Sequence, residues 1–366
     1  MKINRKYTIA VFLLISLFSG IVLAGCDQEA LFWVIAHELP PIGPVIEGHP
    51  SQIVKLDDRL YVSNSIAVWQ WALGSEPTDS VTTTPNWSKM NRQPSGRIRD
   101  LAVAGTTLFA LADNGTVHAW DGTSWSEIAG PGTVQRIFGA GDFLFAGTLN
   151  NYTYSIFSMN AGSDTLIVRE SNTGFLRGAA YNGTTYVLGT QGGGVYTSPD
   201  GIAIDPVSGY GNIIMGLTEF DGEIYIVSNS QLYQWGVNPT AIGPSYRFTG
   251  AIRVWENRNG ELLLLLGIQL SSGSFAYGYR ELRLPTGSSN DFNMPGLDSP
   301  TSMELDSGRT SAIRNNAVNH LFVMPRFYSS GDDSHRPLIF ASTQRNGLWS
   351  YRVRNGTAQW NGENNR

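Results

Sequence analysis

A short unit of two strands and a tight polar turn recurs along this chain, and this repeat restricts the folds that the chain can adopt. Residues 98–111 (IRDLAVAGTTLFAL) are predicted to form a strand, a turn and a second strand, because two apolar runs flank the turn residues. Residues 176–188 (LRGAAYNGTTYVL) repeat the pattern with Gly-Thr-Thr at the same offset. Five more segments have this shape: 53–62, 134–146, 214–227, 252–265 and 313–324.

The spacing of these units predicts the size of each repeat. The seven second strands are expected to begin at Leu60, Leu108, Leu144, Tyr186, Ile224, Leu262 and Leu321, with spacings of 48, 36, 42, 38, 38 and 59 residues. An average of about 43 residues matches a blade of four short antiparallel strands. Third strands are expected at 67–71, 115–120, 194–197, 231–235 and 348–352. The turn Asp121-Gly122 is expected to lead into a fourth strand at 123–128.

Burial of both sheet faces favours a closed ring of such units. A single four-stranded sheet cannot bury both faces, whereas radially arranged sheets bury theirs against two neighbours. We therefore predict an all-β fold, a β-propeller of seven blades with four antiparallel strands each, in which residues 31–366 form a single domain. The 41 glycines, 11% aromatic residues and 15% charged residues suit a fold with many tight turns.

Several structural alternatives stay open from the sequence. The ring could have six or eight blades, or the chain could form a β-sandwich array or a pair of irregular β-domains. A propeller would close either through the apolar residues 31–36 or through residues 357–360.

The first thirty residues carry a different signal. Lys2, Arg5 and Lys6 precede an apolar run at 8–22, which is too short for a spanning helix and fits a secretory signal peptide. The run ends in the letters LAGC, and the cysteine, Cys26, is the only one in the chain. This segment resembles the bacterial lipobox. The resemblance implies cleavage before Cys26 and attachment of lipid to its thiol.

The lipobox resemblance sets the expected location of the protein. We expect residues 1–25 to be a lipoprotein signal peptide and residues 26–30 a lipidated tether, with palmitate-type acyl chains anchoring the protein to the membrane. The predicted location is extracytoplasmic, on the cell membrane or outer membrane, with the periplasmic or surface face left open. An ordinary signal peptide with an incidental cysteine is the alternative. Loss of residues 1–25 would leave 22 basic and 30 acidic residues, so nucleic acid is not an expected partner.

Arginine recurs near the start of several predicted first strands. It directly follows the opening aliphatic residue in four units, at Arg99, Arg177, Arg253 and Arg314. Arg136 lies one position later in its unit. Because innermost propeller strands begin near one mouth of the channel, these guanidinium groups are expected to ring that mouth. The interpretation favoured from the sequence is structural: each arginine binds carbonyls or a carboxylate of the next blade, such as Asp100. The alternative hypothesis is that the ring binds a carboxylate or phosphate.

A turn motif in residues 189–201 (GTQGGGVYTSPDG) also points to a propeller. Ser198, Asp200 and Gly201 resemble the Asp-box of sialidase-like propellers, in which this turn is a folding element. The resemblance implies fold and not activity. Sialidase chemistry would need an Arg-Ile-Pro segment, and residues 97–99 read Arg-Ile-Arg.

We expect no metal site and no cofactor. The five histidines are His37, His49, His118, His320 and His335. None of them pairs with another at metal-ligand spacing, and there is no second cysteine. Asp332 and Asp333 lack the remaining oxygen pattern of a calcium loop, so a solvated loop is expected there.

These features favour a non-catalytic binding or scaffold protein of the bacterial envelope. The chain resembles bacterial propeller lipoproteins as a class and, more distantly, the propeller lipoprotein of the outer-membrane β-barrel assembly machinery, which implies architecture and location. The expected partner is an envelope protein, with a glycan or small anionic ligand second. The polar segments 285–309 and 326–337 are the expected partner-facing surface. The alternative is a propeller enzyme acting on glycans, a hydrolase or lyase, which would need convergent carboxylates.

Overall fold

The computed structural model describes ten segments of the chain. These are 46–73, 86–236, 239–242, 247–256, 262–269, 277–283, 317–324, 338–344, 347–354 and 357–363. They belong to the unit Pro44–Arg366, so the expected signal peptide 1–25, the tether 26–30 and Cys26 lie outside them. Every regular element in these segments is a strand, and they hold no helix long and apolar enough to cross a membrane.

The described strands pair into antiparallel sheets, six with four strands and one with three. The first three sheets contain β1 (Val54–Leu56), β2 (Arg59–Ser63), β3 (Val68–Ala72) and β4 (Ser88–Lys89); β5 (Ile98–Ala104), β6 (Thr107–Ala112), β7 (Val117–Trp120) and β8 (Trp125–Ile128); and β9 (Val134–Ala140), β10 (Phe143–Asn150), β11 (Thr153–Asn160) and β12 (Ile167–Ser171). The next two contain β13 (Phe175–Tyr181), β14 (Tyr186–Gln191), β15 (Gly194–Ser198) and β16 (Asp205–Val207), and β17 (Ile214–Phe220), β18 (Glu223–Ser228), β19 (Leu232–Gln234) and β20 (Thr240–Ile242). The last two contain β21 (Arg247–Glu256), β22 (Leu262–Gln269) and β23 (Tyr277–Arg283), and β24 (Val318–Met324), β25 (Leu338–Thr343), β26 (Leu348–Arg354) and β27 (Thr357–Gly362).

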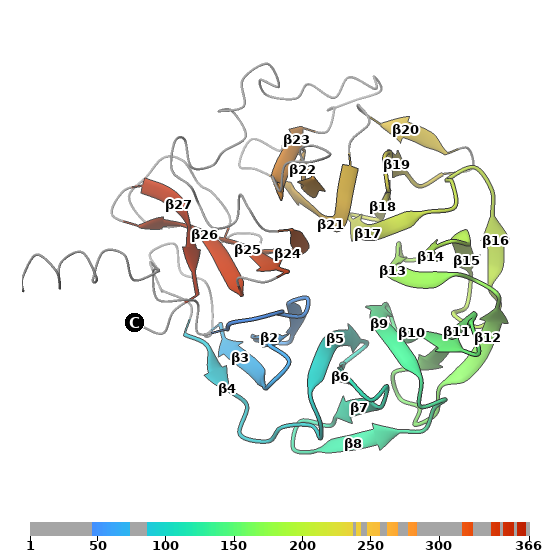
Figure 1. Cartoon of the computed structure of the whole chain (residues 1–366), viewed down its shortest axis with the longest axis horizontal. Helices are drawn as coiled ribbons and strands as arrows, with labels where there is room; N and C mark the ends of the chain where they lie inside the picture. Colours follow the sequence, from blue (N-terminus) through green and yellow to red (C-terminus); the bar gives the residue numbers. More distant parts are fainter. Residues whose placement is uncertain are drawn as a thin grey trace, which may run out of the picture. The chain divides into compact units, whose positions relative to one another are not determined.

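The sheets stand side by side around a common centre, with the first strand of each sheet innermost (Figure 1). Successive inner strands contact one another from β5 through β9, β13, β17 and β21 to β24. Apolar side chains fill the space between neighbouring sheets: Phe109 and Leu111 of one sheet share a buried cluster with Ile137 and Leu144 of the next. This is a β-propeller with four-stranded antiparallel blades, which confirms the predicted all-β fold.

The turn pattern located most strands correctly and failed in the last unit. Strands β2, β6, β10, β14, β18 and β22 begin within one residue of the predicted second strands. The prediction for Leu321 is wrong, because this residue lies in the innermost strand β24, and the second strand is β25. Strands β24 and β25 are separated by residues 325–337, so no tight turn marks their connection and the pattern was placed one strand too early.

The ring closes through non-covalent contacts between the first and last sheets. Residues 357–360, one of the two predicted closing segments, lie in β27 and pair with β26 at the outer edge of the last sheet. The other, 31–36, lies outside the described residues. The backbone ahead of β1 also joins the last sheet, since the Leu348 N–H donates to the Ile46 carbonyl at 2.9 Å and the Gly347 N–H to the Gly48 carbonyl at 3.1 Å.

A buried carboxylate reinforces this closure. Glu363, just after β27, is 1% exposed and accepts a hydrogen bond at 3.0 Å from the Trp87 indole N–H and another from the Ser350 hydroxyl. Trp87 precedes β4 of the first sheet, and its ring lies 5.8 Å from that of Phe340 in the last sheet. The C-terminal end of the described chain is therefore fixed to the first blade as well as the last.

A β-bulge interrupts the inner strand at the same place in five sheets. In β5, Ile98 pairs with Ala112 and Asp100 with Leu111, which leaves Arg99 as the extra residue. The extra residues in β9, β13, β17 and β24 are Gln135, Arg177, Met215 and Asn319. In β21 the irregularity is longer and runs from Phe248 to Ile252. Because a bulge redirects neighbouring side chains, this repeated feature determines what faces the channel.

Glycines in the inner strands allow neighbouring blades to touch backbone to backbone. A Cβ atom on Gly139 of β9 would lie 1.7 Å from the Val103 carbonyl oxygen of β5, and one on Gly216 of β17 would lie 2.1 Å from the Gly250 oxygen of β21. At these two positions a side chain would force adjacent blades apart.

We therefore expect Gly139→Ala to destabilise the propeller by about 3 kcal/mol, the upper end for overpacking, because the clash is with backbone. Gly236→Ala is the matched control, since a Cβ there meets nothing within 4 Å. Urea unfolding followed by tryptophan fluorescence measures both. Equal midpoints for the two variants would contradict this account of blade packing.

We expect Glu363→Ala to cost about 2–4 kcal/mol, because it leaves the buried Trp87 and Ser350 donors without this acceptor. Glu363→Gln keeps one acceptor oxygen and should lose less. Thermal unfolding of the two variants checks the order. A loss in Glu363→Ala no larger than that of an exposed control, Glu223→Ala, would rule out a role in closure.

Candidate ligand-binding cavity

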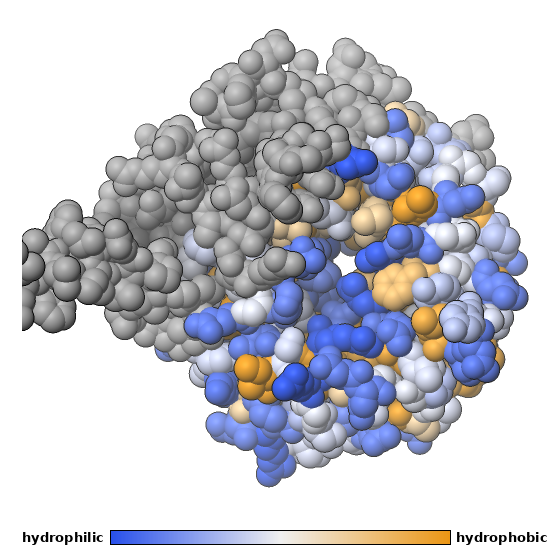
Figure 2. All heavy atoms as spheres, in the orientation of Figure 1, coloured by the Kyte–Doolittle hydropathy of each residue, from blue (hydrophilic) through white to orange (hydrophobic). Residues whose placement is uncertain are grey.

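The inner strands enclose a central cavity of about 260 Å³. Its walls come from β9, β13, β17, β21 and β24, together with Gln52 ahead of β1. Figure 2 shows that mostly hydrophilic residues surround the central opening on the face in view. The volume is just below the roughly 300–1,000 Å³ of pockets for drug-sized ligands, so the cavity suits a small molecule or ion.

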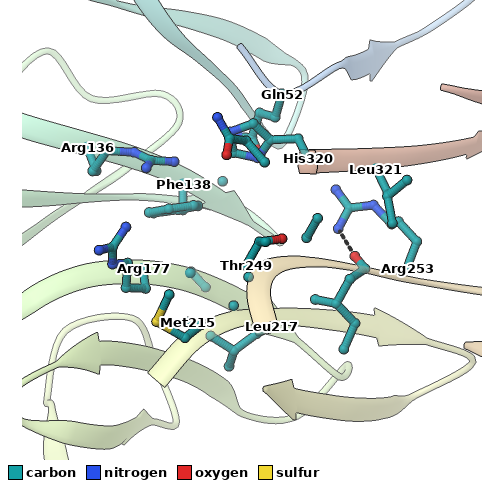
Figure 3. Close-up of a pocket in the computed structure, with 18 residues that line it drawn as sticks. Gln52, Arg136, Phe138, Arg177, Met215, Leu217, Thr249, Arg253, His320 and Leu321 are labelled. Carbon is teal, nitrogen blue, oxygen red and sulfur yellow. Dashed lines mark hydrogen bonds between the residues drawn. The ribbon is translucent and has the colours of Figure 1, made fainter. Parts of the chain in front are cut away.

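Cationic and neutral polar groups converge on this cavity. Its polar side chains are those of Arg136, Arg177, Arg253, His320, Asn319, Gln52 and Thr249. In Figure 3, Arg136 and Arg177 lie on one side of the cavity and Arg253 on the other. Among the described residues that line it there is no aspartate or glutamate.

Arg136 is the partly neutralised cation of the three. Its Nε donates to Asp100 Oδ2 at 3.0 Å across the contact between β5 and β9, and its guanidinium lies 5.1 Å from the Phe138 ring. Asp100 is 2% exposed, and burial raises the pKa of its carboxyl above the ordinary value although Arg136 opposes the shift. Asp100 thus holds Arg136 in place at the cost of its own desolvation.

Arg177 is the bulged residue of β13 and is held by neutral groups. Its Nε donates to Gln191 Oε1 at 2.9 Å, its Nη2 donates to the same oxygen, and its guanidinium lies 4.8 Å from the Phe175 ring. Burial, followed by repulsion from Arg136, lowers the pKa of Arg177. Arg136 and Arg177 therefore present two neighbouring positive charges on one wall.

Arg253 and His320 face this wall from β21 and β24. The described part of the chain offers Arg253 one hydrogen bond, from Nη1 to the adjacent Ile252 carbonyl at 3.0 Å, and burial lowers its pKa to about 10. Burial, and then the charges of Arg136 and Arg253, lower the pKa of His320 well below its ordinary value. Both side chains are half-buried and line the cavity.

The predicted arginine ring is only partly present. Arg99 and Arg177 share the bulge position, yet Arg99 does not line the cavity, because its Nη2 donates to the Val134 carbonyl of the next blade at 2.7 Å. Arg253 follows the longer irregularity of β21, so it lies at a different level from Arg177, and the expectation of one shared strand position is wrong. Arg314 lies outside the described residues, and the bulge residue of β24 is Asn319.

The sequence interpretation missed His320 and underrated Arg136. His320 was considered only as a metal ligand, and Arg136 only as an offset arginine. Both directly follow the bulged residue, as Asp100 does in β5, so they occupy one structural position. In all three strands an aliphatic residue, a variable residue and a polar residue follow one another. This repeated motif predicts the polar position only when the bulge at the variable residue is known.

The Asp-box-like turn lies between β15 and β16, at the outer part of its blade. Asp200 Oδ1 accepts hydrogen bonds from the Ile202 and Ala203 N–H groups at 2.8 and 2.9 Å, and these bonds lower its pKa. Asp121 plays the same part between β7 and β8, with bonds from the N–H groups of Thr123 and Ser124. Both turns organise hairpins and neither carboxylate lines the cavity.

Nothing in the described segments supports metal binding. They contain no group of three or more His, Cys, Asp or Glu side chains placed to hold a metal ion. Asp332, Asp333 and the segments 285–309 and 326–337 lie outside the described residues, so their predicted roles stay predictions.

The chain is a β-propeller protein by similarity as well as by topology. It is similar to the WD40 β-propeller domain of Doa1, with 10% identity over 85% of this chain and 94% of that one and a TM-score of 0.51. It is also similar to the computationally designed Ika8 protein, with 8% identity over 84% and 97% of the two chains and a TM-score of 0.50. The extracellular domain of BT4673 from B. thetaiotaomicron shows 14% identity and a TM-score of 0.48, and the match covers 84% of this chain but only 39% of that one.

The similarities to the Doa1 domain and to Ika8 show the fold alone. No protein-family model and no curated protein matches the chain. Any function must therefore be argued from the site.

We expect Arg136→Ala to lower stability by about 3 kcal/mol at neutral pH, because it leaves the Asp100 carboxylate buried without its cation. The pKa of Asp100, already raised, should rise further above the value of about 3.9 typical of unfolded chains. The free-energy cost of burying the Asp100 carboxylate therefore applies at pH values above that raised pKa. It is lost as the pH falls through the raised pKa and the carboxylate becomes protonated. The difference from wild type should shrink between neutral and acid pH.

Urea unfolding at two pH values measures this difference, with Asp100→Asn/Arg136→Ala as the control that removes the stranded charge. A pH-independent loss, or an equal loss in the double variant, would show that Arg136 acts only through packing.

Proposed function

We propose that this protein is a lipid-anchored, extracytoplasmic β-propeller that binds a ligand or partner without transforming it. The cavity is the observation that carries the binding role. Its described polar groups are guanidinium, imidazole, amide and hydroxyl groups, which hold ligands through hydrogen bonds and charge.

A glycan hydrolase or lyase is the second candidate, and the same cavity favours binding over it. Glycoside hydrolysis uses a pair of carboxylates that flank the bond to be broken. Asp100, the carboxylate that contacts the cavity residue Arg136, is paired with that residue between two blades. This arrangement fixes a cation and does not supply an acid or base.

A protein of the envelope is the proposed macromolecular partner. Ile66 is 78% exposed and Tyr152 is 99% exposed. Both lie on turns that join the second and third strands of their blades, and in a propeller such turns share one face of the ring. Tyr152 has a φ of 65°, which a tyrosine seldom adopts, and its ring is presented to solvent. Tyrosine is frequent among the residues that anchor protein–protein contacts.

The lipid anchor follows from Cys26 and the lipobox resemblance. The acyl chains would place the propeller beside the membrane through the short tether 26–30. We also infer that the ring has seven blades, with β21–β23 as one of them, because this sheet stands between its neighbours through β17·β21 and β21·β24 contacts.

Crosslinking and affinity capture from intact envelopes test the binding role. We expect the wild-type protein to capture an envelope protein, and Tyr152→Ser with Ile66→Ser to reduce capture while leaving the fold intact. Recovery of a processed glycan with no captured protein would favour the enzyme instead.

We expect Cys26→Ala to abolish lipid attachment and release the protein from the membrane fraction, because the thiol is the proposed acylation site. Metabolic labelling with palmitate and fractionation measure both effects. Asp27→Ser, which keeps the cysteine, is the control. Membrane retention and labelling of Cys26→Ala would contradict the proposed anchor.

A further inference from the structure

We propose that the central cavity binds a small oxyanion, a carboxylate, sulfate or phosphate group, between Arg177 and Arg253 and takes it up together with a proton on His320. This inference rests on the proposed binding role and names the ligand class of the same cavity. The His320 imidazole then adds a fourth positive charge to those of the three guanidinium groups when the anion binds.

Positive charge exceeds negative charge among the described groups at the cavity. Three guanidinium groups line it, and among the described side chains only Asp100 offsets one of them, Arg136. Arg177 is held by a neutral amide, and Arg253 by a backbone carbonyl. Charges withdrawn from water are costly unless they are paired, so a bound anion would relieve a cost that the described protein groups leave in place.

Arg177 and Arg253 have more N–H donors than their hydrogen bonds to the described residues use. Arg253 spends Nη1 on Ile252, and Arg177 spends Nε and Nη2 on Gln191, so each guanidinium keeps N–H groups for a ligand. Figure 3 shows these two side chains on opposite sides of the cavity. Both side chains line the same cavity of about 260 Å³, which has room for a small tetrahedral or planar oxyanion with water.

His320 lines the cavity together with the three arginines. The charged groups that act on it come from two other elements, Arg136 of β9 and Arg253 of β21, while Arg177 of β13 lines the same cavity. The carboxylate of Asp100 of β5 is engaged by Arg136. In the empty cavity these cations disfavour protonation of the imidazole. A bound anion offsets part of this positive charge, so the pKa of His320 rises on binding.

These two pKa values of His320, in the free protein and in the complex, determine how anion affinity depends on pH. The pKa of His320 is below its ordinary value in the free protein and higher in the complex, so binding takes up a proton when the pH lies between the two values. Anion affinity should therefore increase as pH falls through that window, by up to about tenfold per pH unit for one proton.

Isothermal titration calorimetry of the full-length protein with sodium sulfate tests both steps, because sulfate stays a dianion and contributes no proton of its own. We expect a dissociation constant of about 1 mM or tighter near neutral pH. Measurement in two buffers of different ionisation enthalpy should show net proton uptake. Titration with glycerol phosphate beside free phosphate separates a phosphate ester from a free ion: either one binding at this cavity supports the site.

Four variants assign the effects. Arg177→Gln and Arg253→Gln should each weaken sulfate binding by at least about tenfold. Arg247→Gln, an exposed arginine on the same strand as Arg253, makes the same change of charge and should leave binding unaltered. His320→Gln should retain binding at about pH 8 but lose the proton uptake and the pH dependence. Thermal unfolding of each variant confirms that the ring is intact.

Three results would overturn the inference. The first is that sulfate, phosphate and glycerol phosphate all fail to bind. The second is equal affinity for sulfate in Arg253→Gln and Arg247→Gln. The third is proton uptake that persists in His320→Gln. The first two reject the oxyanion site and the third rejects the proton step. Capture of an envelope partner despite these results would leave the proposed function standing, so the two failures are distinguishable.

Discussion

Contact between neighbouring blades is the interaction on which the rest of this structure depends. Each sheet has two apolar faces, and neither can be covered from within the blade. The ring covers both, and it brings the inner strands so close that Gly139 lies against the Val103 carbonyl. Hydroxyl groups reinforce the joints, as when Ser342 donates to the Ser51 carbonyl at 2.7 Å between the last and first blades. A ring held this way is cooperative, because opening one joint exposes the faces of two sheets.

The cavity is a geometric result of the same packing. Twisted sheets that touch along their inner strands cannot meet at the axis, so a channel remains there. The repeated bulge lets side chains leave the blade contact and enter this space. Polar residues can occupy these positions without entering the apolar faces, which explains why Arg177, Asn319 and His320 coexist with an apolar core. The fold thus provides a place where residue choice has little effect on blade packing.

The fold was more predictable from sequence than the site, for a physical reason. Strand pairs joined by tight turns leave a local signature, such as Gly-Thr-Thr before β6 and β14, and the same signature is absent where β24 and β25 are separated by a long connection. Side-chain direction is not local. Arg99 and Arg177 occupy one bulge position, yet Arg99 turns to the Val134 carbonyl and Arg177 lines the cavity, because the neighbouring blades offer them different partners. The bulge in β21 then shifts Arg253 to another level.

The partners of each guanidinium group distinguish arginines that join blades from arginines that are available to a ligand. Arg99 and Arg136 are bound to groups of adjacent blades, a carbonyl and a carboxylate, so their positions follow from assembly of the ring. Arg253 has no such tie to another blade among the described residues. If stability alone determined this position, an aliphatic side chain would cost less than a buried guanidinium. Arg253 is such a cation, and it also lowers the pKa of His320. A ligand that supplies the negative counter-charge would explain why a guanidinium group occupies this position.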